Sequence, residues 1–132
     1  MPEKCPMRMF SAFLLCVFTF CFLMAMPGLG MAVELSAPSG VSASDGAYPD
    51  RVRVTWNPVK NATSYIVYRA TFAAGTRTLV YTTTEPPFND HLVSPLVTYY
   101  YWVKAATDSS GTNASDFSSS DSGRRSVVTY VL

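Results

Sequence analysis

The residues that could do chemistry in this sequence are few and scattered. His91 is the only histidine, and it directly follows Asp90. An acid and a histidine are two parts of the arrangement that activates a serine nucleophile, and serines are plentiful in the chain. None of those serines stands in the Gly-x-Ser-x-Gly pattern of a nucleophile elbow. We therefore interpret His91 as a solvated loop histidine and not as a catalytic base.

Other patterns of catalytic and metal-binding residues are missing from the sequence. A single histidine cannot supply a histidine-based metal site, and no cysteine–histidine spacing typical of zinc ligands occurs. The carboxylates do not form a close pair on one predicted strand, so glycoside hydrolysis has no support. We predict no catalytic residue, no metal ligand and no cofactor, and we expect a protein that is not an enzyme. Two triplets, at Asn61 and Asn113, match the glycosylation sequon and fall in predicted loops.

The N-terminal segment 1–32 has the order of a secretory signal. Lys4 and Arg8 precede an uncharged apolar run at 10–26, and small residues follow it. The pattern Gly30-Met31-Ala32 predicts cleavage near Ala32. An uncleaved anchor stays open as the alternative, because a helix of this length spans about 26 Å against a hydrocarbon core of about 30 Å. We expect a secreted, periplasmic or cell-surface protein, which contacts a membrane only through 10–26 if the signal is not cleaved.

Composition limits what the rest of the chain can bind. All three cysteines lie within the signal, so the domain that follows must be stabilised by packing without a disulfide. Ten Lys and Arg residues nearly balance nine Asp and Glu residues in the whole chain. A balanced surface gives no electrostatic reason to expect nucleic acid as a partner.

From residue 33 on, short alternating runs separated by turn residues predict strands. The run 51–56 alternates polar and apolar residues, which places Val52, Val54 and Trp56 on one face. Further strands are predicted from β-branched and aromatic residues. They fall at 41–43, 64–69, 78–82, near 88–93, at 98–105 and within 117–128. Seven short strands at this spacing predict an all-β sandwich.

The stretch from 38 to 125 resembles a fibronectin type III domain of the kind found in bacterial extracellular proteins. The motifs that carry the resemblance stand in the family's order: Pro38-Ser39-Gly40-Val41, Val52-Arg53-Val54-Thr55-Trp56-Asn57-Pro58, Ala62-Thr63-Ser64-Tyr65-Ile66-Val67-Tyr68-Arg69, Val93-Ser94-Pro95, Tyr99-Tyr100-Tyr101-Trp102-Val103-Lys104-Ala105, Ser115-Asp116-Phe117-Ser118 and Asp121-Ser122-Gly123-Arg124-Arg125. The resemblance implies a seven-stranded immunoglobulin-like sandwich at 33–125. It also implies a tyrosine corner at Val93 and Tyr99, in which Leu96 replaces the usual glycine.

The same resemblance assigns the two faces of the strands. It implies a structural core of Val52, Val54, Trp56, Tyr65, Val67, Tyr99, Tyr101 and Val103. Strand alternation then turns Ile66, Tyr68, Tyr100 and Trp102 to the other face of one sheet, where we expect an exposed aromatic surface. Four such side chains approach the size at which an exposed apolar patch signals a contact.

The apolar tail at 126–132 has two open interpretations. It extends the last strand, with Val128 and Tyr130 on one face, or it pairs with the edge of another chain. Of the two, we expect the extension.

These observations predict an exported interaction or adhesion module that acts through its aromatic sheet face or its loops. A protein partner or self-association is expected, a glycan is a further possibility, and no nucleic acid is expected. Two other functions stay open: a structural spacer or self-assembling surface subunit, and an accessory domain for polysaccharide binding or degradation.

Overall fold

The computed structural model describes residues 32–132. The apolar run at 10–26, the three cysteines and nearly all of the predicted signal (1–32) lie outside the described residues. Val33–Leu132 forms one compact unit, which contains the seven strands and the buried core described below. A unit with its own core has what a domain needs to fold alone. Within residues 32–132, no helix has the length and apolar character needed to cross a membrane.

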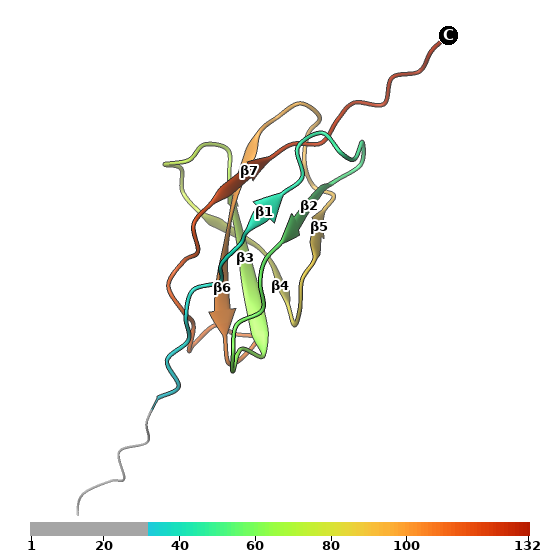
Figure 1. The fold of residues 1–132 in the computed structure, drawn as a ribbon. Helices are drawn as coiled ribbons and strands as arrows, with labels where there is room; N and C mark the ends of the chain where they lie inside the picture. Colours follow the sequence, from blue (N-terminus) through green and yellow to red (C-terminus); the bar gives the residue numbers. More distant parts are fainter. Residues whose placement is uncertain (1–31) are drawn as a thin grey trace, which may run out of the picture. The chain divides into compact units, whose positions relative to one another are not determined.

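Seven strands of this unit form two antiparallel sheets (Figure 1). The strands are β1 (Ser42–Ala43), β2 (Val52–Thr55), β3 (Ser64–Ala70), β4 (Thr78–Thr83), β5 (Phe88–Asp90), β6 (Tyr99–Ala106) and β7 (Asp121–Gly123). One sheet has the order β1-β2-β5, and the other has the order β4-β3-β6-β7. The predicted all-β, seven-stranded sandwich is therefore confirmed.

Alternation of polar and apolar residues explains the strands on both sides of the core. In β2, Val52 and Val54 are fully buried while Arg53 between them is exposed. In β6, Tyr101 and Val103 are fully buried in the core, and Trp102 between them lies outside the inter-sheet core. A single residue of slip would turn each set to the wrong face, so the two hydrophobic sets fix the register of their strands.

The core between the sheets contains every residue that the sequence assigned to it: Val52, Val54, Trp56, Tyr65, Val67, Tyr99, Tyr101 and Val103. The Trp56 and Tyr65 rings pack at a centroid distance of 5.4 Å. The Tyr65 hydroxyl also accepts a hydrogen bond of 2.8 Å from the Val59 backbone N–H. Leu35 and Phe88 complete the same cluster.

A tyrosine corner joins β6 to the loop before it. The Tyr99 hydroxyl accepts a hydrogen bond of 3.0 Å from the Ser94 backbone N–H. Leu96 in the same loop adopts a φ of 61°, in the left-handed region that favours glycine. The chain thus makes the turn that the resemblance implies, with a leucine in the conformation where glycine is usual.

The two long sides of the sandwich differ. On one side β1 and β7 lie close together. The Ala43 backbone N–H donates to Asp121 Oδ2 at 2.8 Å, and a pair of backbone hydrogen bonds links Ser44, Gly46 and Arg124. On the other side, β4 and β5 are the outer strands of their sheets and have no strand beyond them in the described part of the chain. We call the first the closed side and the second the open side.

The predicted extension of the last strand into the tail is wrong. β7 ends at Gly123, and a 2.9 Å hydrogen bond from the Ser126 N–H to the Tyr48 carbonyl holds the chain just before the tail departs. From 127 to 132 the chain is exposed, carries no strand and runs away from the sandwich (Figure 1). The start of β6 explains the difference, because Gly123 pairs with Tyr99, the first residue of β6, so β6 offers no further strand residue to the chain beyond 123.

Candidate functional site

The aromatic surface predicted for Ile66, Tyr68, Tyr100 and Trp102 is covered in the structure. None of the four belongs to the inter-sheet core, as alternation predicts. However, Ile66 and Trp102 are each only 3% exposed, and Tyr68 and Tyr100 are half-buried. The expectation that these residues form an exposed docking surface is therefore wrong.

Phe117 and Arg77 lie over Tyr68 and Trp102. The Phe117 ring meets the Tyr68 ring edge-on, at a centroid distance of 4.9 Å. The Arg77 guanidinium lies 4.7 Å from the centre of the Trp102 ring and 4.3 Å from that of Phe117. Cations favour this position over an aromatic ring. These four side chains form a layer of their own outside the sheet.

Two serines hold the Phe117 segment against β6. Ser115 Oγ accepts from the Ala105 N–H at 3.0 Å, and the Ser115 N–H donates to the Ala105 carbonyl at 2.8 Å. Ser118 makes the same pair of bonds with Val103, both at 2.9 Å. Both serines are buried. This segment looks like a polar loop in sequence, and Phe117 is its one large apolar residue that signals contact with the sheet.

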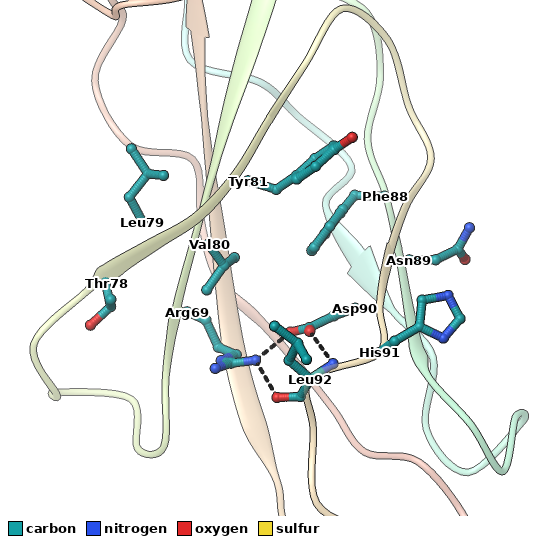
Figure 2. Close-up of a pocket in the computed structure, with 10 residues that line it drawn as sticks. All are labelled: Arg69, Thr78, Leu79, Val80, Tyr81, Phe88, Asn89, Asp90, His91 and Leu92. Atoms are coloured by element: carbon teal, nitrogen blue, oxygen red, sulfur yellow. Dashed lines mark hydrogen bonds and ion pairs between the residues drawn. The ribbon is translucent and has the colours of Figure 1, made fainter.

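Asp90 is the centre of a buried polar cluster at the open side (Figure 2). Its carboxylate accepts hydrogen bonds from Arg69 at 2.7 Å and from the Leu92 N–H at 3.0 Å, both drawn in Figure 2. It also accepts a hydrogen bond of 3.0 Å from the Tyr101 hydroxyl. Arg69 also donates to the Leu92 carbonyl at 2.8 Å. Burial, followed by the neighbouring Asp90 charge, raises the pKa of the Tyr101 phenol well above its usual range, so the hydroxyl remains a donor.

The Asp90 and His91 side chains make different contacts. The Asp90 carboxylate is occupied by Arg69 and Tyr101, whereas the His91 ring is exposed and lies 3.7 Å from Asp50. The two residues therefore do not form the acid–histidine pair of a triad. Within the described residues, no group of three or more His, Cys, Asp and Glu side chains is placed to hold a metal ion.

The open side carries a hollow of ≈ 460 Å³ between β4 and β5. Its lining residues come from both strands, from β3 and from the turn after β5 (Figure 2): Arg69, Thr78, Leu79, Val80, Tyr81, Phe88, Asn89, Asp90, His91 and Leu92. The Tyr81 and Phe88 rings stack across it, with centroids 4.9 Å apart and planes 16° apart. A register shift in the β3–β4 pairing leaves Val80 as an extra residue, and Val80 packs against the core.

Apolar side chains remain exposed around this hollow. Leu79 is 53% exposed, Tyr81 is 51% exposed and Leu92 is 85% exposed. This hollow was not predicted from the sequence. A signal was present, because the run Thr78-Leu79-Val80-Tyr81 is apolar on both faces, whereas one face of an outer strand is ordinarily polar.

The acceptor asparagines of the two sequons lie at the surface. Asn61 and Asn113 are both exposed, as their predicted loop positions require. Asn61 has a φ of 67°, a conformation that asparagine tolerates better than most residues.

Comparisons with protein-family models and with curated proteins gave no match. Solved structures do match. An Fn3-like protein from Clostridium thermocellum aligns with a TM-score of 0.62 and 25% identity, over 74% of this chain and 100% of that one. A β-1,2-glucanase from Parabacteroides distasonis aligns with a TM-score of 0.60 and 24% identity, over 72% of this chain but only 13% of the glucanase. The fn3 domain of the human collagen alpha-1(XX) chain aligns with a TM-score of 0.56 and 18% identity, over 80% of this chain and 99% of that one. These matches, the strand order and the tyrosine corner agree with the resemblance seen in the sequence: the chain is a fibronectin type III-like β-sandwich.

Proposed function

We propose that this chain is an exported, non-enzymatic binding module that docks an extended, apolar segment of a partner protein at the open side, between β4 and β5. The observation that carries this proposal is the hollow of ≈ 460 Å³ beside two outer strands. It offers unpaired backbone groups and apolar side chains in the same place. An added peptide strand uses both, the first for affinity and the second for specificity.

The composition of β4 supports strand addition. Outer strands are usually protected by charged side chains, by proline or by a bulge. β4 has the sequence TLVYTT, with no charge and no proline, and only the irregularity at Val80 interrupts it. Leu79 and Tyr81 flank that position, and both are about half exposed. Tyr81 pairs with the core residue Val67, and Leu79 pairs with Tyr68 on the other face. An added segment with apolar residues on its core side would therefore bury Tyr81.

A peptide display experiment tests this function. Residues 33–132 are used to select from a library of ten-residue peptides, and we expect enrichment of uncharged sequences with alternating apolar residues. Tyr81→Lys places a charge in the hollow and should abolish binding of the selected peptides. Thr84→Lys adds the same charge at an exposed residue outside the hollow and should leave binding unchanged. Selection of no such peptides, or equal binding by both variants, contradicts the proposed site.

Export is the second part of the proposal, and it is supported by the basic, apolar and small-residue order of segment 1–32. A mass measurement on the protein recovered from its host tests it. A mature chain that starts at Val33 is expected. A full-length mass in the membrane fraction supports the anchor, and a full-length mass in the cytosol contradicts export.

A glycan-associated role is the second candidate. It is favoured by one observation, the alignment with a 13% stretch of the β-1,2-glucanase. The half-exposed ring of Tyr81 would be the stacking surface for a sugar. A pull-down of residues 33–132 on insoluble glycans tests this role. If the Tyr81→Ala variant binds the glycan as well as the wild type does, Tyr81 is not the stacking surface for the sugar.

A further inference from the structure

We infer that the segment which docks at the open side is Val127–Leu132 of a second copy of this chain, added as a strand beside β4. This inference rests on the docking site proposed above and names its occupant. In the added strand, Val128, Tyr130 and Leu132 share the face that is directed into the hollow.

The tail has the properties of a strand without a sheet. Its sequence VVTYVL consists of β-branched, aromatic and apolar residues and carries no charged side chain. Tyr130 is 82% exposed and Val131 is 94% exposed. Such a segment is stabilised by any strand edge that pairs with its backbone and covers its side chains. Exposed strands with high β-propensity and no charge associate readily for this reason.

The site matches the tail in charge. Neither β4 nor the tail from 127 to 132 has a charged side chain, so no repulsion opposes their pairing. Because the β3–β4 register shifts at Val80, we expect continuous backbone pairing along 81–83 and side-chain contacts in the hollow beyond it. A hollow of ≈ 460 Å³ lies within the range of about 300–1,000 Å³ that is usual for ligand pockets.

The tail of the same copy does not occupy this site in the structure. The chain before the tail is held at one end of the sandwich, where the Ser126 N–H bonds to the Tyr48 carbonyl and Arg125 bonds to the Val93 carbonyl. From there 127–132 runs away from the sandwich and stays exposed (Figure 1). A tail directed away from its own sandwich is placed to meet the open side of a second copy.

This contact joins two different surfaces of the protein, so further copies can add at the ends of an assembly. Each copy offers one tail and one open side, and both remain available at the ends of any assembly. Head-to-tail contacts of this kind form rings or open chains and not closed two-fold dimers. Self-association should therefore continue beyond a dimer as the concentration rises.

Sedimentation of residues 33–132 over a range of concentrations tests the inference. The wild type should form dimers and larger species, with weak affinity because one short strand buries less than a standard interface. Tyr130→Lys, which places a charge on the face directed into the hollow, should lower the association constant at least about tenfold. Thr129→Lys places the same charge on the opposite face of the same strand and should retain association.

A mixture of two variants, each of which lacks one of the two contact surfaces, tests the inference more sharply than sedimentation of the wild type. A protein without 127–132 keeps its open side, and Tyr81→Lys keeps its tail. Each alone should stay monomeric, and together they should form a 1:1 complex that grows no further. Wild-type protein that stays monomeric at all concentrations, or a mixture that does not pair although both variants show wild-type melting curves, overturns the inference.

The same samples separate the two proposals. If the protein without 127–132 binds display-selected peptides but not the tail of Tyr81→Lys, the docking site stands and the second copy is not its occupant. If it binds neither, the proposed site itself fails.

Discussion

The leucine in the tyrosine-corner loop allows the free-energy cost of its left-handed backbone conformation to be measured by comparing two variants. Leu96 has a φ of 61° and is 62% exposed, and its N–H donates to the Arg125 carbonyl at 3.2 Å. Leu96→Ala and Leu96→Gly both remove the side chain beyond Cβ, and both keep the backbone hydrogen bond. Only the glycine variant removes Cβ, which is the atom that makes the left-handed conformation unfavourable.

The expected difference follows from two opposing terms. The left-handed conformation costs a residue with a Cβ about 1–2 kcal/mol. Glycine loses about 0.5–1 kcal/mol more conformational entropy on folding. Leu96→Gly should therefore be more stable than Leu96→Ala by about 0.5–1 kcal/mol. For a domain of this size, that difference corresponds to a rise in Tm of roughly 2–6 °C.

Thermal and urea unfolding of both variants measures this difference. The wild type is the reference for the packing of the leucine side chain beyond Cβ, which both variants remove equally. If the alanine variant is as stable as the glycine variant or more so, Leu96 is not held in the left-handed region, and our account of this turn is wrong.

Three further predictions concern hydrogen bonds of the described residues. Tyr99→Phe removes the acceptor for the Ser94 N–H and should lower the free energy of unfolding by about 1 kcal/mol in urea titrations. Asp90→Ala leaves Arg69 without its 2.7 Å carboxylate partner, and removal of one partner of a largely buried pair should cost about 3–5 kcal/mol, measured in the same way. A serine hydroxyl two residues along the chain holds the pKa of Asp108 below its usual range, which carboxyl NMR titration should detect. Because the folded pKa of Asp108 is the lower one, its contribution to stability is present above the unfolded pKa and is lost as the pH falls through the folded pKa.

The strands could be predicted from local patterns, and the core could be predicted from those patterns together with the family resemblance. Alternation alone places Val52 and Val54 on one face, and the corner tyrosine fixes the inward face of β6. Alternation could also show that Trp102 points away from the core, but not whether it is exposed. That depends on Phe117, which is held over the sheet by serine side chains in a segment without a strand pattern.

The open side depends on strand order and could not be predicted from local pattern. The residues of the run 78–83 do not indicate that β4 is the last strand of its sheet. The stacking of Tyr81 on Phe88 joins strands from different sheets, so it does not follow from a local pattern. The tail shows the opposite limitation. Its composition predicts a strand, but β6 begins at Tyr99 opposite Gly123 and offers no pairing partner to the residues beyond.

The contrast between the two sides of the sandwich has a consequence for local opening. Backbone and carboxylate bonds tie β1 to β7, so separating the layers there breaks several links at once. Between β4 and β5 the layers meet through stacked rings and the Asp90 cluster. Amide protons of β4 should therefore exchange with solvent deuterium sooner than those of β6. The layers should separate first at the open side, where a binding segment would enter.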